Sequence, residues 1–204
     1  MILYVETNFL MSIAKGQDCQ AEDLLKNTPT SVRLAVPSIC YVEALTTWEQ
    51  EEKYSKDFLR RVDIQINEAA RDKTSQNAQL LRTLLDQARV SFNKRTNDIE
   101  QLFYSAFNQL SSKAEMITLN TGILQENLNR PILEKHVIDK LILECIVHHA
   151  RLHPNETKVF LSSNSKEFGK REVTEVLQDT GVQYFSNTQN LVGYSLSLIE
   201  SAAY

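Results

Sequence analysis

Short apolar runs and longer amphipathic segments alternate along this chain, and the alternation predicts an α/β fold. The apolar runs, which predict buried strands, are Ile2–Val5, Val32–Val36, Met116–Leu119, Val159–Leu161 and Val182–Phe185. Helical spacing is found between them at Phe9–Lys15, Ala21–Lys26, Thr121–Leu128, Leu133–Leu152 and Phe168–Asp179, with one helix following Ser38 and a last one capped by Asn187 and ending near Ala203. Strands that alternate with helices predict a parallel sheet covered by helices on both faces.

The middle of the chain has a different pattern. No glycine or proline occurs from Trp48 to Lys113, and apolar residues recur there every three or four positions. This spacing predicts two long helices, with the polar segment Arg71–Asn77 as the turn between them. We therefore expect an α/β domain formed by residues 1–45 and 116–204, into which residues 46–115 are inserted as a helical hairpin. The hairpin is either a structural arm with a solvated charged face or a surface for a partner or RNA.

Composition narrows the class of protein. The chain has 204 residues with 22 basic and 26 acidic side chains, and its net charge of −4 excludes a broadly basic nucleic-acid binder. The three cysteines are far apart, as is typical of a reducing compartment. The first residues do not resemble a signal peptide, and no run of about 18 apolar residues predicts a membrane span. We expect a cytoplasmic protein.

Polar residues follow two of the predicted strands. Glu6 comes directly after the first strand, while Asn164 and then Glu167 follow the strand at Val159–Leu161. Ligands of an open parallel sheet bind beyond the carboxyl ends of its strands. Glu43 and Asp139 lie within apolar helical segments, where a carboxylate is costly unless it is paired or binds a cation. Acids that converge on one site repel each other, and a divalent metal such as Mg²⁺ relieves that repulsion.

The order of these motifs resembles the PIN domain family. The chain has Val5-Glu6-Thr7-Asn8 after its first strand, then Pro37-Ser38 followed by Glu43, then Asp139 in a long apolar helix, and finally the segment Phe160-Leu161-Ser162-Ser163-Asn164-Ser165-Lys166-Glu167-Phe168. The resemblance covers Met1 to about Leu45 and about Met116 to Tyr204, but not the hairpin. It implies a PIN-like Rossmannoid sheet and a metal-dependent endoribonuclease that hydrolyses the phosphodiester bonds of single-stranded RNA.

The resemblance also implies roles for individual residues. Glu6 and Asp139 would be the main ligands of Mg²⁺ or Mn²⁺, and Glu43 would bind a second metal or orient the attacking water. Asn164 and Glu167 would complete the shell, with Glu167 as a further metal ligand. Thr7, Asn8, Ser163 and Ser165 would contact the carboxylates or a substrate phosphate.

Alternatives remain open at each position. Glu6 could be an exposed acid at a strand end, Glu43 could form a cap or a surface ion pair, and Asp139 could pair with Lys135 or Lys140. Asn164 could be a turn residue, and Glu167 could be a first-turn acid favoured by the helix dipole.

Two departures from the family pattern bear on the function. Glu6 stands where the family usually has Asp, and Asn164 stands where it usually has an acid. Glu6 motivates an alternative function, that of a catalytically impaired module that binds RNA or a protein.

The resemblance and the hairpin also suggest partners. The nuclease could be the toxin of a toxin–antitoxin pair, with RNA and an antitoxin or other protein as partners and no membrane association. The hairpin could serve as a dimerisation or antitoxin-docking arm, and we expect a homodimer.

Overall fold

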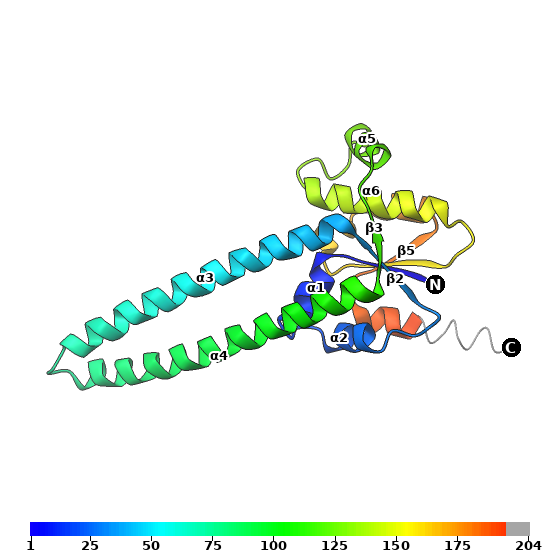
Figure 1. The fold of residues 1–204 in the computed structure, drawn as a ribbon. Coiled ribbons are helices and arrows are strands. Elements are labelled where there is room, and N and C mark those ends of the chain that lie inside the picture. The colour runs from blue at the N-terminus through cyan, green and yellow to red at the C-terminus, as the bar shows by residue number, and fades with distance from the viewer. Residues whose placement is uncertain (195–204) are drawn as a thin grey trace. The chain divides into compact units, whose positions relative to one another are not determined.

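A computed structural model describes residues 1–194 of the chain, which contain a five-stranded parallel sheet (Figure 1). The order of the strands in the sheet is β3-β2-β1-β4-β5. Their bounds are β1 Ile2–Val5, β2 Arg33–Pro37, β3 Glu115–Ile117, β4 Lys158–Leu161 and β5 Val182–Phe185. All five strands predicted from the sequence are therefore present, and the predicted α/β class is confirmed.

Strand β1 is central, with β2 on one side and β4 on the other. Leu3 is paired with Leu34 of β2 and with Val159 of β4. Every residue of β1 and β4 is buried, because helices cover both faces of the sheet. The chain builds β1, β2 and β3 outward in one direction and then returns to add β4 and β5 on the other side of β1. The point where the direction reverses therefore lies between β1 and β4.

Helices pack on both faces of the sheet. In Figure 1, α6 lies on one face beside α5, and α1 and α2 lie on the other. The helices of this part are α1 Thr7–Ala14, α2 Cys19–Lys26, α5 Thr121–Asn129, α6 Val137–Leu152, α7 Ser165–Phe168 and α8 Arg171–Asp179. A further helical stretch covers residues 188–194. The predicted end of that helix near Ala203 lies outside the described residues.

Two predicted helices begin at other residues in the structure. The helix predicted from Leu133 begins at Val137, because Leu133 is buried with a positive φ of 52° that is incompatible with a helix. The helix predicted over Phe168–Asp179 begins at Arg171 as α8, because Phe168 is the last residue of the short helix α7, Gly169 ends that helix and Lys170 is extended. The change in direction between them places Glu167 and Lys170 close together.

The two longest helices are α3 Ser38–Arg71 and α4 Gln76–Lys113. The chain divides into two compact units, one formed by residues 1–44 and the described residues from Phe103 onward, the other by residues 45–102. The beginning of α3, which carries Glu43, and the end of α4 thus belong to the sheet unit. Both helices continue without a break into the second unit.

The second unit is an antiparallel pair of helices. Phe58 of α3 packs on Phe92 of α4 with 4.6 Å between ring centroids, and Arg89 donates to Asp63 at 3.0 Å. Asp72 accepts from the backbone N–H groups of Thr74 and Ser75 in the turn. The turn between the two long helices therefore lies within the predicted segment Arg71–Asn77.

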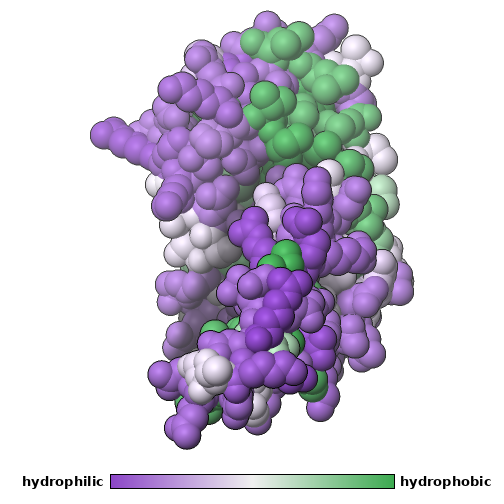
Figure 2. Space-filling model, turned by 90° about the vertical axis from the view of Figure 1, so that its left-hand side faces the viewer, coloured by the Kyte–Doolittle hydropathy of each residue, from purple (hydrophilic) through white to green (hydrophobic). Residues whose placement is uncertain are grey.

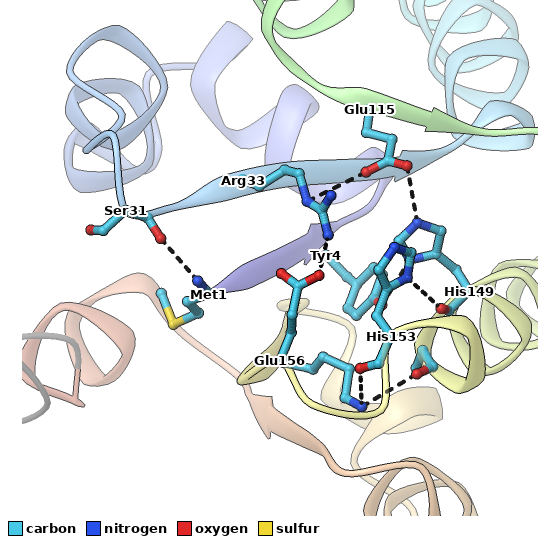
Figure 3. A network of polar contacts seen from close by, with 10 residues as sticks. Met1, Tyr4, Ser31, Arg33, Glu115, His149, His153 and Glu156 are labelled. Atoms are coloured by element: carbon cyan, nitrogen blue, oxygen red, sulfur yellow. Dashed lines mark hydrogen bonds and ion pairs between the residues drawn. The ribbon is translucent and has the colours of Figure 1, made fainter.

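A polar network holds the amino ends of the strands together (Figure 3). Tyr4 Oη and His149 Nδ1 are 2.9 Å apart, and His149 Nε2 is 3.2 Å from a carboxylate oxygen of Glu115. Arg33 contacts both Glu115 and Glu156. Burial lowers the pKa of His149, so its neutral form accepts a hydrogen bond from Tyr4 and donates one to Glu115.

The same network shows a structural role for the two histidines near the end of α6. The rings of His149 and His153 stack with centroids 4.3 Å apart, and His153 Nδ1 donates to the backbone oxygen of His149 at 2.9 Å. Their i, i+4 spacing could have formed a metal site. Here the ring of His149 fastens α6 to β1 and β3, and the ring of His153 packs against it.

Apolar side chains also gather on the surface of the sheet unit. Figure 2 shows hydrophobic residues concentrated toward the top of the view, where α5 and α6 lie in Figure 1. Leu124 and Leu128 of α5 and Val137 of α6 are exposed, Leu128 by 84%. None of the described helices is both long enough and apolar enough to cross a membrane.

Candidate active site

The predicted site residues lie at the carboxyl edge of the sheet, around the point where the strand order reverses. Glu6 follows β1 directly, and Ser162 and Asn164 follow the neighbouring strand β4. Glu43 lies in the second turn of α3, which starts where β2 ends, and Asp139 lies in the first turn of α6. Four separate segments therefore bring polar groups to the place where open parallel sheets bind their ligands.

Glu6 is the most buried of the acids, with 3% of its surface exposed. It is the N-cap of α1, where Oε2 accepts from the backbone N–H of Asn8 at 2.7 Å. Its other oxygen, Oε1, is buried and has no hydrogen-bond partner among the described residues. Burial raises the pKa of Glu6 to about 7, although the Asn8 amide and the Ser162 hydroxyl counteract part of that effect. The interpretation of Glu6 as an exposed strand-end acid is therefore wrong.

Glu43 is half-buried and is held by a residue adjacent to Glu6. The hydroxyl of Thr7 donates to Glu43 Oε2 in a short contact. Burial is the largest cause that raises the pKa of Glu43, and the charge of Asp139 raises it further. Thr7 therefore links the start of α1 to the acid of α3, as expected for a residue that orients a carboxylate.

Asp139 has two neighbours that donate or could donate to it. Asn164 Nδ2 is 3.3 Å from Asp139 Oδ1, and His136 Nδ1 is 3.8 Å from Oδ2. Burial raises the pKa of Asp139, while His136 and Asn164 lower it and Glu167 raises it. Within the described part of the chain, neither Lys135 nor Lys140 forms an ion pair with this acid.

Glu167 is engaged by two cationic or potentially cationic groups. Lys170 Nζ makes a short contact with Oε2, and His136 Nε2 is 3.3 Å from Oε1. The hydrogen bond from Lys170 is the main reason that the pKa of Glu167 lies below its ordinary value. Both carboxylate oxygens are therefore occupied, and a metal ion would have to compete with Lys170 and His136 for this ligand.

The remaining predicted residues have less direct contacts. Asn8 reaches Glu6 through its backbone, while its own side chain is half-buried. Asn164 precedes α7, but its side chain does not cap that helix. The side-chain amide is therefore available to donate to Asp139. Ser163 and Ser165 are exposed and are joined by a backbone hydrogen bond of 2.8 Å. Their side chains are therefore available to a substrate rather than committed to an acid.

The carboxylates are close enough to influence one another. The charges of Glu43 and Asp139 both raise the pKa of Glu6, and the charge of Asp139 raises that of Glu43. As the side chains stand, no three His, Cys, Asp or Glu residues of residues 1–194 are grouped tightly enough to hold a metal ion. The donor set nevertheless suits a hard divalent cation, because it consists of carboxylate oxygens and includes the buried, unpaired Oε1 of Glu6.

Sequence reasoning missed two groups at this edge. His136 and Lys170 both contact Glu167, and His136 also lies beside Asp139. The spacing of three residues from His136 to Asp139 and from Glu167 to Lys170 was a usable signal, since residues three apart meet on a helical turn. The signal was weak, because both pairs lie at helix boundaries that the sequence placed incorrectly.

The sequence model of the family described as PIN domain matches residues 3–168. No curated protein and no protein of solved structure matches the chain. The family match includes Glu6, Glu43, Asp139 and Asn164, and it also spans the inserted helices.

Proposed function

Because this chain belongs to the PIN domain family, whose fold is of the nuclease type, we propose that it is a metal-dependent endoribonuclease that hydrolyses single-stranded RNA. The observation that carries the proposal is the buried, unpaired Oε1 of Glu6, which lies under the electrostatic influence of Glu43 and Asp139. An orphaned carboxylate oxygen among other acids is costly unless a proton or a bound cation neutralises the charge. This explains why the chain would maintain such an arrangement.

Glu6, Glu43 and Asp139 would hold Mg²⁺ or Mn²⁺, directly or through water. The bound metal would supply an acidified water and stabilise charge on the phosphate. Thr7 keeps Glu43 in position through its hydroxyl, and the N–H of Asn8 fixes one oxygen of Glu6 so that the other remains available. These contacts orient the ligands before any metal arrives.

Asn164 and Glu167 have supporting roles in this proposal. Asn164 donates to Asp139 and can offer its carbonyl oxygen to a metal or its water. Glu167 completes the shell through water and also holds Lys170 and His136 at the edge of the acids. The ammonium group of Lys170 beside the acids would favour the approach of an RNA phosphate.

The decisive experiment is cleavage of a fluorescently labelled single-stranded RNA by the purified chain with Mn²⁺ or Mg²⁺. We expect Asp139→Asn to abolish cleavage and Asp98→Asn, the same chemical change at an exposed hairpin position, to leave it intact. Equal cleavage by the wild type and by Asp139→Asn would identify a contaminant and refute the proposal.

A second candidate is an impaired module that binds RNA or protein without cutting. It is favoured by the occupied oxygens of Glu167 and by the absence, within residues 1–194, of three acids grouped as a ready metal site. Calorimetric titration with Mn²⁺ separates the two candidates. Metal binding together with RNA turnover supports the enzyme, whereas RNA binding without any metal requirement supports the module.

The biological setting that we propose is that of a toxin with a protein antitoxin. The exposed apolar side chains of Leu124, Leu128 and Val137 support a protein partner, because exposed apolar patches mark interaction sites. Expression of the wild type should arrest growth of a bacterial host, and Asp139→Asn should not. Growth that is unaffected by active nuclease would contradict the toxin role.

We also propose that the chain is a homodimer through its hairpin. The exposed side chains of Leu80, Leu81 and Leu84 on α4 support this, because two helices alone leave much apolar surface uncovered. Light scattering should give twice the chain mass for the wild type and the single mass for Leu84→Glu. A monomeric wild type would rule out this arrangement.

A further inference from the structure

Lys140 is a buried lysine next to one of the candidate acids, and its charge is unpaired. It directly follows Asp139 near the start of α6, and 8% of its surface is exposed. Among residues 1–194, its ammonium group forms no hydrogen bond and no ion pair. Lysines are seldom buried to this extent without a partner, so the unpaired charge needs an explanation.

Other buried charges around α6 do have partners. Glu144 is completely buried and accepts from the guanidinium group of Arg130. Lys158 is 4% exposed and donates to two backbone oxygens near the end of α6. These contacts show how a charge that serves only the fold is satisfied in this protein, and Lys140 lacks any such contact in the described part of the chain.

The side chain of Lys140 has a covered stem and an accessible end. Its ammonium nitrogen is not one of the fully buried polar atoms, so the charged end reaches solvent while the carbon stem is packed. Side chains of an α-helix lean toward its N-terminus, and a lysine is about as long as one helical turn. The ammonium group is therefore directed toward the start of α6.

The start of α6 has its own unsatisfied donors. The first N–H groups of a helix have no partner within the helix. The N-cap of α6 is His136, and its side chain forms no capping hydrogen bond. These N–H groups and the helix dipole favour an anion, and the ammonium group of Lys140 adds a full positive charge at the same end.

The candidate acids do not use this charge. The groups that lower the pKa of Asp139 are His136, Asn164 and Lys170, and Lys140 is not one of them. Lys170 differs from Lys140 because it is already paired with Glu167. An RNA strand that approaches the acids meets their negative charge, and Lys140 offers a positive charge that no described residue neutralises.

We propose that Lys140 and the first N–H groups of α6 form a phosphate subsite that holds a backbone phosphate of the RNA strand beside the cleaved bond. The inference rests on the proposed ribonuclease function and adds a substrate-binding residue to it. A contact to the backbone positions the strand but does not read its bases. Lys140 should therefore contribute equally to the binding of different sequences.

The test measures RNA binding to the full chain in EDTA, so that neither a metal nor cleavage is needed. Fluorescence anisotropy follows labelled hexamers of uridine and of adenosine over a range of salt concentrations. Lys140→Met keeps an apolar side chain in place of the buried stem and removes the charge. At low salt this variant should bind both hexamers about tenfold more weakly than the wild type, as expected for the loss of one hydrogen bond to a charged group.

The dependence on salt gives a second measure of the same contact. The slope of log affinity against log salt concentration should become less steep by about 0.7 in Lys140→Met, the value for one phosphate contact of a single strand. Lys140→Arg retains the charge and should keep the slope of the wild type. Lys140→Gln is also neutral and should reproduce the loss, so the test does not depend on the folding of one variant.

A matched control and a stability measurement complete the test. Lys26→Met, the same change at an exposed lysine of α2, should bind RNA as the wild type does. In urea unfolding, Lys140→Met should be no less stable than the wild type, because the ammonium group that it removes has no partner among residues 1–194. Weaker RNA binding by this variant would then reflect the lost charge and not a damaged fold.

The outcomes distinguish this inference from the nuclease proposal. If the wild type fails to cut RNA with Mn²⁺ but its affinity and salt dependence require the charge of Lys140, the subsite stands and the nuclease proposal fails. Equal affinity and slope in the wild type and Lys140→Met, a loss confined to one of the two hexamers, or no binding of RNA by the wild type would overturn the subsite even if the enzyme is active.

Discussion

The buried carboxyl group of Glu6 should make the metal-free protein less stable as the pH rises. Glu6 is 3% exposed and has one oxygen without a hydrogen-bond partner in the described part of the chain. Replacing it with glutamine removes the charge but retains an oxygen that can accept from the N–H of Asn8, so the N-cap of α1 is preserved. The Glu6→Gln substitution therefore isolates the effect of the charge.

The magnitude follows from the pKa of Glu6, which burial raises from 4.5 to about 7. As the pH rises, Glu6 loses its proton in the unfolded chain near pH 4.5 but keeps it in the folded chain until about pH 7. Between these two values the unfolded state is therefore favoured increasingly. The contribution of Glu6 to stability is therefore present below pH 4.5, declines as the pH rises from 4.5 to 7, and is gone above pH 7. A separation of about 2.5 between the two pKa values corresponds to about 3 kcal/mol.

Urea unfolding followed by circular dichroism measures this effect in the presence of EDTA. From pH 5 to pH 8 the wild type should lose about 2.5 kcal/mol of unfolding free energy that Glu6→Gln keeps. Glu172→Gln, the same change at an exposed position of α8, should behave like the wild type. Excess Mn²⁺ at pH 8 should raise the unfolding free energy of the wild type but leave that of Glu6→Gln unchanged. Parallel pH profiles for the wild type and Glu6→Gln would refute the reasoning.

Three other substitutions test the site and the fold. Asn164→Asp adds a carboxylate beside Asp139 and should tighten Mn²⁺ binding about tenfold by calorimetry; weaker binding would show that the amide is needed as a donor. Gly181→Ala should cost about 1 kcal/mol in urea unfolding, because φ is +73° there, whereas Gly193→Ala in an open position should not. Tyr4→Phe should cost about 1 kcal/mol and raise the pKa of His149 measured by nuclear magnetic resonance, because the neutral ring loses a donor. An unchanged pKa would mean that the hydroxyl does not determine the charge of the ring.

The strands of the sheet could be predicted from the sequence because each is a short apolar run bounded by turn residues. The helix boundaries around the site could not be predicted as well. The buried Leu133 continues the apolar pattern of α6 although its backbone has a positive φ. Similarly, the apolar spacing continues across Gly169 although the chain turns there between α7 and α8. The spacing of apolar residues indicates which positions are buried. Burial alone does not distinguish a helix from a buried turn.

The candidate site shows a similar limit. The order of Glu6, Glu43 and Asp139 on the expected elements was enough to predict that they would influence one another, which their pKa shifts support. Lys170 and His136 both contact Glu167. These contacts depend on the turn between α7 and α8 and on the residue where α6 begins, and neither could be predicted from the sequence. Charge partners at helix boundaries require coordinates, because an error of a few residues moves a side chain to another face.

The position of Glu6 at the start of α1 affects how related sequences should be read. A descendant of this protein that had lost its chemistry would still need a hydrogen-bond acceptor at this point to begin the helix. Selection for folding alone can therefore preserve an acid here long after selection for activity has ended. Asp139 does not cap α6, whose N-cap is His136. Under the proposed nuclease function, the retention of Asp139, rather than of Glu6, is the better guide to which relatives remain active.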